Sequence, residues 1–403
     1  MGELTEVEIC DRANVESAFV KELVDCGVLE PEPDARPYRA GDVWRTRLAK
    51  ACVDAGLPLE GIGEAIRRRL LTLSMLDLPQ YAHWSGYANE TYEQLAERTG
   101  LPVEFFAQAH EAAGFPPAAP TDRVREDELG SIPATQIALA FGFPMDSVLR
   151  VYRVYGENLR RIAQVESQQY HEHVDIPLQQ QGLSHAEVFE QGSAFGEQIM
   201  EVLDAALLAT YHRHREATWM GDLVEHIEAA LDEGGLYAKL DRPPAMVFLD
   251  LTGYTKLTEE RGDAAAASMA RALSSLVSST ARRHGGEAVK FLGDGVMFYF
   301  PDPGRAVLAS LEMVLSTEEA GLPPAHVGIA SGPVIKQDGD YFGRTVNLAS
   351  RIAGKASSSE VLVSADVAEL CGGQIGVEFV PLGPVELKGV ERLTELFGAS
   401  RSD

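Results

Sequence analysis

Cysteine is scarce in this chain of 403 residues, which contains only four: Cys10, Cys26, Cys52 and Cys371. None of them stands in a Cys-x-x-Cys spacing, which excludes the zinc ribbons and dithiol redox sites that use this motif. Isolated cysteines of this kind are typical of reduced thiols, and we therefore expect a cytoplasmic protein.

Basic residues and long apolar runs are also in short supply. The chain has 35 Lys and Arg against 61 Asp and Glu, a formal net charge of -26. Broad nucleic-acid binding requires a basic face, so we expect no nucleic-acid partner. No apolar run approaches the roughly 20 residues of a membrane-spanning helix, so we expect no membrane span.

Two regions of the chain differ in their hydrophobic pattern. Residues 1–240 repeat apolar side chains at helical spacing between turn sequences such as GFPPAAPTD, which predicts an all-α domain. Its last part, about 195–232, is predicted to be a long linker helix. After the turn DRPPAM, strands and helices alternate in the order βαββαβαβ, and VPLGPVELKGVERLTELF is predicted to close the chain as a hairpin. We expect an α+β protein with two domains, 1–240 and 241–403.

Two aspartates lie at the ends of apolar strands in the second region. Asp250 closes the strand AMVFLDL, and Asp294 lies at the tip of the hairpin AVKFLGDGVMFYF. If these strands are neighbours in one sheet, the two carboxylates meet at one edge. Without a nearby histidine or cysteine they suit a hard cation such as Mg²⁺ or Mn²⁺. Taken singly, each is also explained as a helix N-cap or a turn residue.

The turn that follows Asp250 favours a phosphate ligand. Its sequence TGYT offers backbone N–H groups near Gly253 that suit a triphosphate. No Walker A motif occurs anywhere in the chain, which excludes a P-loop mechanism.

Four motifs of the second region resemble those of class III nucleotide cyclases, the family that makes cyclic AMP or cyclic GMP. They are FLDLTGYTKL, VKFLGDGVMFYF, DYFGRTVNLASRI and VELKGVERLTELF, and the resemblance covers about residues 243–398. It implies a ferredoxin-like α/β catalytic domain in which Asp250 and Asp294 hold two Mg²⁺ or Mn²⁺ ions per active site. It also implies that the ribose 3′-hydroxyl attacks the α-phosphorus of a nucleoside triphosphate and that pyrophosphate leaves.

The residues that contact the purine in this family fall on Lys290 and Asp340. Adenine presents an acceptor at N1 and a donor at N6, which a lysine and an aspartate complement, whereas guanine inverts this pattern. The pair therefore predicts ATP over GTP, and an adenylate cyclase over a guanylate cyclase. A strand lysine also commonly extends its ammonium group into solvent, and Asp338 competes with Asp340 for the assignment.

The remaining predicted site residues lie on a helix and in two loops. Asn347 and Arg351 are four residues apart, hence on one helical face. By resemblance, Asn347 orients the ribose, Arg351 stabilises the transition state and Lys388 binds phosphate, while Gly253 and Thr255 flank the metal site. In the family, the metal aspartates and the purine and transition-state residues come from different subunits, which implies a homodimer with two composite sites.

One alternative belongs to a different class of function, a regulatory protein that senses a nucleotide through a non-catalytic cyclase domain. The complete set of matching residues favours catalysis, because an inactive domain usually lacks an aspartate or the arginine. A diguanylate cyclase would share a similar topology, but the sequence contains no GGDEF-like run.

The N-terminal region resembles a MerR-type winged helix-turn-helix at residues 15–66, and a second such pattern occurs at 91–115. Acidic residues outnumber basic ones over residues 1–90, so we expect a regulatory or dimer scaffold rather than a DNA-binding domain. The overall plan resembles the pH-responsive mycobacterial adenylyl cyclases, in which the N-terminal domain restrains the catalytic dimer.

Most of the ten histidines precede residue 240, and histidine titrates near neutral pH. His212, His214 and His226 lie on the predicted linker helix and are therefore candidates for a switch, although ordinary surface histidines produce the same pattern. The pair His171 and His173 could contribute to a metal site, but no cysteine or third histidine lies in sequence range.

Overall fold

The computed structural model describes residues 4–33, 37–77, 85–237, 242–254, 259–260, 262–372, 376–390 and 392–402, and the structural statements below refer to these residues. By its contacts the chain divides into two compact units, Met1–Val224 and Glu225–Asp403. Within the described ranges, no helix combines the length and the hydrophobicity of a membrane span.

The N-terminal unit is helical, as the apolar periodicity predicts. Its α-helices are α1 (Glu6–Ala13), α2 (Ser17–Asp25), α3 (Ala40–Asp54), α4 (Leu59–Arg67), α5 (Tyr92–Thr99), α6 (Val103–Ala113), α7 (Ile132–Ala140), α8 (Met145–Tyr170), α9 (Ile176–Gln180) and α10 (His185–Glu233). Short helical turns join them at η1 (Ser74–Asp77), η3 (Glu128–Ser131) and η4 (His171–Asp175).

The expectation of an all-α domain is wrong in one detail. A two-stranded antiparallel sheet joins β1 (Tyr87–Thr91) to β2 (Arg123–Arg125). The sequences YANET and RVR show no extended apolar alternation, so the periodicity of the chain gives no sign of them. These strands form because each pairs with the other across more than thirty residues of chain.

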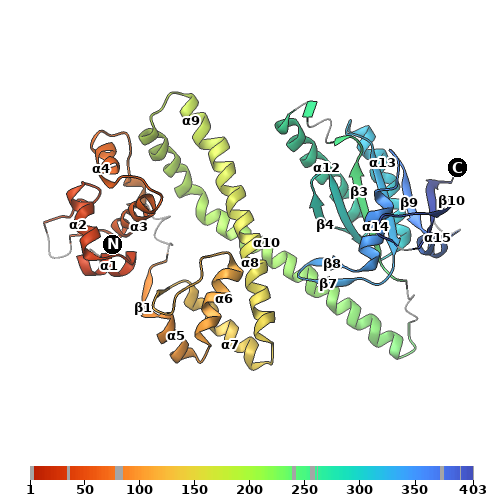
Figure 1. The fold of residues 1–403 in the computed structure, drawn as a ribbon, viewed down its shortest axis with the longest axis horizontal. Coiled ribbons are helices and arrows are strands. Elements are labelled where there is room, and N and C mark those ends of the chain that lie inside the picture. Colours follow the sequence, from red (N-terminus) through yellow and green to blue (C-terminus); the bar gives the residue numbers. More distant parts are fainter. Residues whose placement is uncertain are drawn as a thin grey trace. The chain divides into compact units, whose positions relative to one another are not determined.

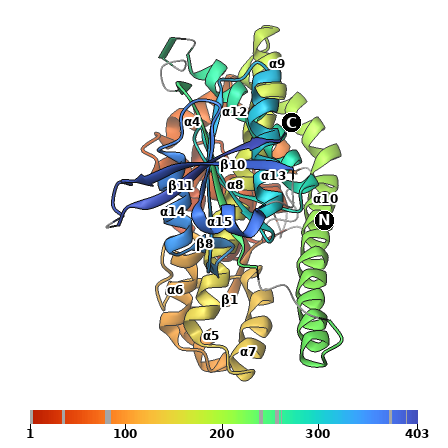
Figure 2. The same ribbon diagram turned by 90° about the vertical axis from the view of Figure 1, so that its right-hand side faces the viewer.

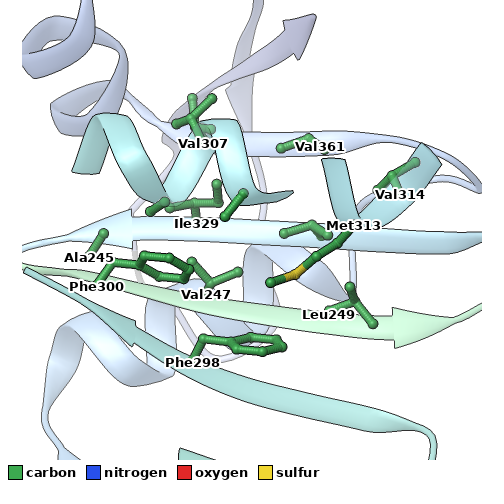
Figure 3. Close-up of a cluster of buried hydrophobic side chains, with 14 of the residues drawn as sticks. Ala245, Val247, Leu249, Phe298, Phe300, Val307, Met313, Val314, Ile329 and Val361 are labelled. Atoms are coloured by element: carbon green, nitrogen blue, oxygen red, sulfur yellow. The ribbon is translucent and has the colours of Figure 1, made fainter. Parts of the chain in front are cut away.

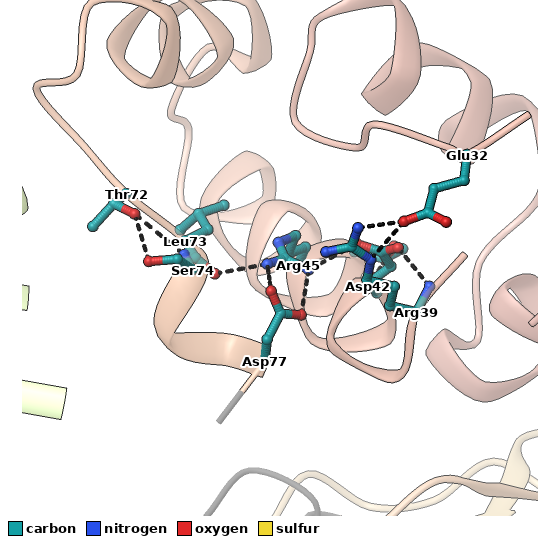
Figure 4. Close-up of polar contacts among 9 residues, drawn as sticks. Glu32, Arg39, Asp42, Arg45, Thr72, Leu73, Ser74 and Asp77 are labelled. Carbon is teal, nitrogen blue, oxygen red and sulfur yellow. Dashed lines mark hydrogen bonds and ion pairs between the residues drawn. The ribbon is translucent and has the colours of Figure 1, made fainter. Parts of the chain in front are cut away.

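The first lobe of this unit, residues 4–77, has its own core around Ile9, Leu23 and Leu29. Arg45 on α3 is nearly buried and donates to Asp42 Oδ1 at 2.8 Å, to Asp77 Oδ2 at 2.5 Å and to the Leu73 carbonyl at 3.1 Å (Figure 4). A buried guanidinium is stable only with such partners. The network therefore fastens the segment around η1 to α3.

The second lobe is built on α5, α6 and α8 around the buried rings of Phe105 and Phe106. Helix α5 ends at Gly100, whose φ of 74° lies in the left-handed region, and α6 follows directly. The end of α6 packs against α8 at Gly156, where a Cβ atom would lie 2.3 Å from the Ala113 carbonyl oxygen. Only glycine permits this approach of the two helices.

Helix α10 is one continuous helix of 49 residues (Figures 1 and 2). It contains the segment 195–232 that the sequence predicts as a linker helix. Beyond residue 200 many of its apolar side chains are exposed, among them Val202, Leu208, Trp219 and Ile227. The division between the two units falls inside this helix.

The C-terminal unit is organised around a β-sheet (Figure 1). Its seven strands have the order β10-β11-β9-β6-β3-β5-β4. Only the β6–β9 pair is parallel among the described pairs of this sheet. The strands of the sheet are β3 (Ala245–Leu251), β4 (Glu287–Leu292), β5 (Gly295–Phe300), β6 (Ala325–Ser331), β9 (Val361–Ser364), β10 (Val377–Val385) and β11 (Thr394–Arg401).

Helices cover both faces of this sheet. One face packs against α12 (Asp263–Arg283), α13 (Pro303–Glu319) and α15 (Ala365–Cys371), where Val247, Phe298 and Ile329 are among the side chains that form the main core (Figure 3). The other face packs against α14 (Arg344–Ala353) through Met246, Met297 and Ile352. Alternate residues of β3 therefore point to different cores.

Helix α14 lies unusually close to the sheet at Gly328 on β6. A Cβ atom at this position would lie 2.0 Å from the backbone nitrogen of Ala353. This contact fixes the helix that carries two of the predicted site residues.

The observed elements follow the predicted order βαββαβαβ with additions. Helix α15 and a small separate hairpin, β7 (Ile335–Gln337) and β8 (Asp340–Phe342), were not predicted. The sequence of β4 is largely apolar, yet the strand lies at the edge of the sheet, and Lys290, Phe291 and Leu292 are exposed.

Candidate functional site

The two predicted metal aspartates lie on neighbouring strands. Asp250 is the penultimate residue of β3, and β3 pairs with β5 through Leu249 and Val296. Asp294 stands in the two-residue turn between β4 and β5, directly before Gly295. A Cβ atom at Gly295 would lie 3.5 Å from Asp250 Oδ1, which places the turn beside the Asp250 carboxylate.

The turn between β4 and β5 consists of Gly293 and Asp294. Gly293 has a positive φ, of 72°. A positive φ at only the first turn residue is the pattern of a type II′ turn, whose twist matches that of the flanking strands. The rigid turn sets the position of the Asp294 backbone.

The electrostatics around Asp250 and Asp294 favour a cation. Burial raises the pKa of the Asp250 carboxyl, and the charge of nearby Asp294 raises it further. The described residues contain no cluster of three or more His, Cys, Asp or Glu side chains that would enclose a metal. Two carboxylates with no third protein ligand fit an ion such as Mg²⁺, which commonly keeps water and phosphate oxygens as its other ligands.

Lys290 and Asp340 form an ion pair, although 50 residues separate them in the chain. Lys290 Nζ on β4 donates to Asp340 Oδ2 on β8 at 2.5 Å. Burial acts to raise the pKa of Asp340, but the hydrogen bonds from Lys290 and from the Tyr341 backbone N–H outweigh it, and the pKa is lowered. Asp338, the competing candidate, occupies the β7–β8 turn with a φ of 56°.

Asn347 and Arg351 lie on the exposed side of α14, as their spacing of four residues predicts. Thr345, Ala349 and Ile352 occupy the opposite side of the helix and are buried. In the described part of the chain, no hydrogen bond or ion pair joins the two metal aspartates to Asn347 or Arg351. Within this subunit the structure places the Asp294 turn beside Asp250 and joins Lys290 to Asp340, whereas Asn347 and Arg351 have no such contact with the aspartates.

The remaining predicted residues lie in loops. Lys388 is exposed in the turn between β10 and β11, where the Val390 N–H donates to the Leu387 carbonyl at 3.1 Å. Gly253 follows β3 with a φ of 78°, a conformation that glycine adopts readily. Thr255 lies outside the described residues.

The sequence of this unit matches a known family. Residues 236–397 match the adenylate and guanylate cyclase catalytic domain. The C-terminal domain is a class III cyclase catalytic domain. The resemblance of its four motifs is thereby confirmed, and the sheet with helices on both faces is the fold of this cyclase domain.

Relatives of the chain carry cyclase names. A pH-sensitive adenylate cyclase of Mycobacterium tuberculosis is 27% identical over 321 residues, which cover 76% of this chain and 77% of that protein. An adenylate cyclase of Streptomyces coelicolor is 27% identical over 278 residues, 68% of this chain and 70% of its own. Both matches are longer than the cyclase domain, so the likeness extends into the helical N-terminal region.

Among solved structures, the adenylyl cyclase CyaB from Pseudomonas aeruginosa matches at 24% identity. The match covers 40% of this chain and 95% of that chain, with a TM-score of 0.35.

The three histidines predicted as switch candidates are all exposed on α10. His212, His214 and His226 have no hydrogen bond or ion pair to another described residue; the ring of His212 lies 5.8 Å from that of Tyr211. His171 contacts Asp175 four residues later, with Nδ1 and Oδ2 3.2 Å apart, and neither it nor His173 belongs to a metal-binding cluster in the described residues.

A different histidine of the cyclase is embedded in a polar cluster. His110 Nε2 on α6 lies 3.1 Å from Glu128 Oε2 and 3.0 Å from the Tyr92 hydroxyl, and that hydroxyl donates to Glu128 at 2.5 Å. Its Nδ1 lies 3.1 Å from the Pro116 carbonyl. Sequence analysis missed this cluster because its members come from α5, α6 and η3, and no local pattern links them.

We expect His110 to make the stability of the N-terminal unit depend on pH. The hydrogen bond with Glu128 raises the pKa of His110 above its ordinary value, against the opposing effect of burial. The stabilisation is therefore complete below about pH 6.5, the ordinary histidine pKa, and is lost as the pH rises through the higher folded-state pKa. We expect His110→Gln to lower the unfolding free energy more at pH 6 than at pH 8.5.

Chemical denaturation of full-length wild type and variant across this pH range measures the difference. His214→Gln, on the exposed surface of α10, is the matched control and should show little change at any pH. A destabilisation by His110→Gln that stays constant from pH 6 to pH 8.5 would contradict the prediction.

Proposed function

We propose that the protein is an adenylate cyclase that converts ATP into 3′,5′-cyclic AMP and pyrophosphate. The ion pair between Lys290 and Asp340 carries this proposal. It presents a donor for adenine N1 beside an acceptor for the adenine 6-amino group. Guanine would face the wrong partner at both positions, and these unmatched polar groups disfavour its binding.

The metal-binding part of the proposal rests on Asp250 and Asp294. Their adjacent carboxylates would hold two Mg²⁺ or Mn²⁺ ions, which supply Lewis acidity to the ribose 3′-hydroxyl and to the triphosphate oxygens. The backbone N–H groups of the turn at Gly253, which directly follows β3 and Asp250, would bind phosphate. No side chain of the set is suited to act as a general base, so positioning and charge neutralisation provide the acceleration.

Three further side chains complete the proposed site. Asn347 holds the ribose in the orientation that attack on the α-phosphorus requires. The Arg351 guanidinium donates to the phosphate oxygens as negative charge builds up in the transition state. Lys388 binds the departing phosphates as a point charge on its exposed turn.

We propose a homodimer with two composite active sites. Asn347 and Arg351 are exposed on α14 and make no hydrogen bond or ion pair with Asp250 or Asp294 among the described residues, which supports sites completed by a second subunit. Exposed apolar side chains beside the Lys290–Asp340 pair support a partner surface there. They are Phe291 on β4, Ile335 on β7 and Phe342 on β8, which are 47%, 63% and 49% exposed.

The helical N-terminal unit is proposed to regulate the catalytic dimer. The relative from Mycobacterium tuberculosis that matches most of the chain is named a pH-sensitive enzyme, which supports control by pH. The pattern α5–Gly100–α6 supports the helix-turn-helix interpretation of residues 91–115, with a scaffold role rather than DNA binding. The free thiols of all four cysteines are consistent with the expected cytoplasmic location.

The proposal predicts cyclic AMP formation from Mn²⁺-ATP by the purified full-length protein, with a rate that differs several-fold between pH 6 and pH 8. Replacing His212, His214 and His226 together by glutamine should flatten this pH dependence if they form the switch. The assay is cyclic AMP formation at both pH values by wild type and the triple variant.

The possible outcomes separate the parts of the proposal. An equal rate at both pH values would retain the cyclase and remove control by pH. A pH dependence unchanged in the triple variant would place the sensor elsewhere. Binding of ATP without any cyclic AMP would favour a nucleotide-sensing regulator with a non-catalytic domain.

A further inference from the structure

The side chain of Asp340 is carried by a short arm, the β7–β8 hairpin, which is not part of the seven-stranded sheet. Its two turn residues, Asp338 and Gly339, have φ angles of 56° and 79°, the pattern of a type I′ turn. The hairpin has three residues in each strand, and a two-stranded ribbon of this size is only marginally stable alone. The position of Asp340 therefore depends on the contacts that dock the arm.

Tyr341 is the buried side chain of this arm. It is 5% exposed and joins the core beneath α14. Its ring stacks on that of Tyr299 on β5, with the centroids 4.4 Å apart and the planes at 11°. Its hydroxyl donates to Glu287 Oε1 on β4 at 2.9 Å. Because a bond to a carboxylate is stronger than a neutral one, the hydroxyl gives the docked arm a directional anchor.

The hydrogen bond from Tyr341 to Glu287 and the ion pair between Lys290 and Asp340 lie close together. Glu287 and Tyr299 are cross-strand partners, and Lys290 lies farther along β4, beyond an irregularity in its pairing with β5. Tyr341 also donates its backbone N–H to Asp340 Oδ1 at 2.9 Å, while Lys290 binds Oδ2. The carboxylate is thus held at both oxygens and still keeps acceptor capacity for a third donor.

We propose that Tyr341 is a positioning residue for adenine recognition, which holds Asp340 at the place where its carboxylate accepts a hydrogen bond from the 6-amino group. This inference rests on the proposed adenylate cyclase activity and adds the residue that sets its specificity. Tyr341 itself does not touch the base. It acts through the β8 backbone and the hydrogen bond to Glu287.

The test compares ATP with purine riboside triphosphate, which lacks only the 6-amino group. Pyrophosphate release measures kcat/KM for both nucleotides with Mn²⁺. Wild type should prefer ATP by about tenfold or more, the value of one well-placed hydrogen bond to a charged group. In Tyr341→Phe, which keeps the ring and removes the hydroxyl, this preference should fall close to one, as it should in Asp340→Ala.

Two variants separate positioning from packing. Tyr299→Phe keeps the stacked ring and removes a hydroxyl that has no hydrogen-bond partner among the described residues, so it should retain the wild-type preference. Glu287→Ala removes the acceptor from an exposed position and should lose the preference, even if Tyr341→Phe fails to fold. Glu287→Gln keeps an acceptor oxygen and should retain most of it.

Equal losses of kcat/KM for both nucleotides in Tyr341→Phe and Glu287→Ala, with the preference unchanged, would overturn the inference. So would a wild-type enzyme that makes no distinction between the two nucleotides. If wild type forms no cyclic product, the proposed function fails. The preference for ATP over purine riboside triphosphate is then measured as a ratio of dissociation constants, by competition against a fluorescent ATP analogue. This ratio tests the role of Tyr341 without requiring catalysis.

Discussion

Mixing the Asp250→Ala and Arg351→Ala variants should restore about one quarter of the wild-type activity, although each variant alone should lose at least about a hundredfold. Asp250→Ala removes a proposed metal carboxylate, and Arg351→Ala removes the guanidinium proposed to stabilise the transition state. In a composite-site dimer, random exchange makes half of the dimers mixed, and each mixed dimer has one intact site. Cyclic AMP formation after subunit exchange, as a function of the mixing ratio, measures the recovery.

A matched control is available within the same aspartate pair. Asp250→Ala mixed with Asp294→Ala should show no recovery. Both substitutions affect the aspartates proposed to bind metal, so every site in the mixed dimer contains one of the two substitutions. Retained thermal unfolding midpoints would show that the single variants are folded. Absence of recovery in the Asp250–Arg351 mixture, despite demonstrated exchange, would exclude sites built from two subunits.

The double substitution Lys290→Glu with Asp340→Ser should reverse the nucleotide preference from ATP to GTP. The introduced carboxylate would accept from guanine N1–H, and the serine hydroxyl would donate to O6. The same change leaves adenine N1 opposite a carboxylate. We expect kcat/KM for ATP to fall by about a hundredfold and the ATP to GTP ratio to drop below one.

Cyclic AMP and cyclic GMP formation by the same preparations give this ratio. Lys336→Glu is the control for the change of charge, because Lys336 lies on β7 with its Nζ 5.7 Å from the Tyr341 ring and does not pair with Asp340. It should leave the preference intact. A double variant that still prefers ATP would show that other groups read the purine edge.

Much of the catalytic domain is predictable from local sequence. The strand AMVFLDL, the hairpin around Gly293 and Asp294, and the helix around Asn347 all appear in the structure where the pattern places them. Each depends on short-range physics: apolar alternation, turn glycines and helical spacing. The four motifs then identify the family, which the match over residues 236–397 confirms.

Other features have no local signal. The edge position of β4 follows from the order of strands in the sheet, and the apolar sequence around Lys290 does not reveal that this strand is exposed. The strands β1 and β2 are short and polar. In both cases the neighbours of the strand, rather than its own residues, determine how much of it is covered.

The sequence by itself determined the candidate residues for the proposed chemistry: the two aspartates at strand ends, the lysine and acid proposed to bind a purine, and the paired Asn347 and Arg351. Only the tertiary structure decided that Lys290 meets Asp340 rather than Asp338, that Tyr341 docks the arm, and that His110 sits beside Glu128 and Tyr92. These groups are far apart along the chain. Their contacts arise when the sheet and helices pack, because burial of the apolar faces decides which distant side chains become neighbours.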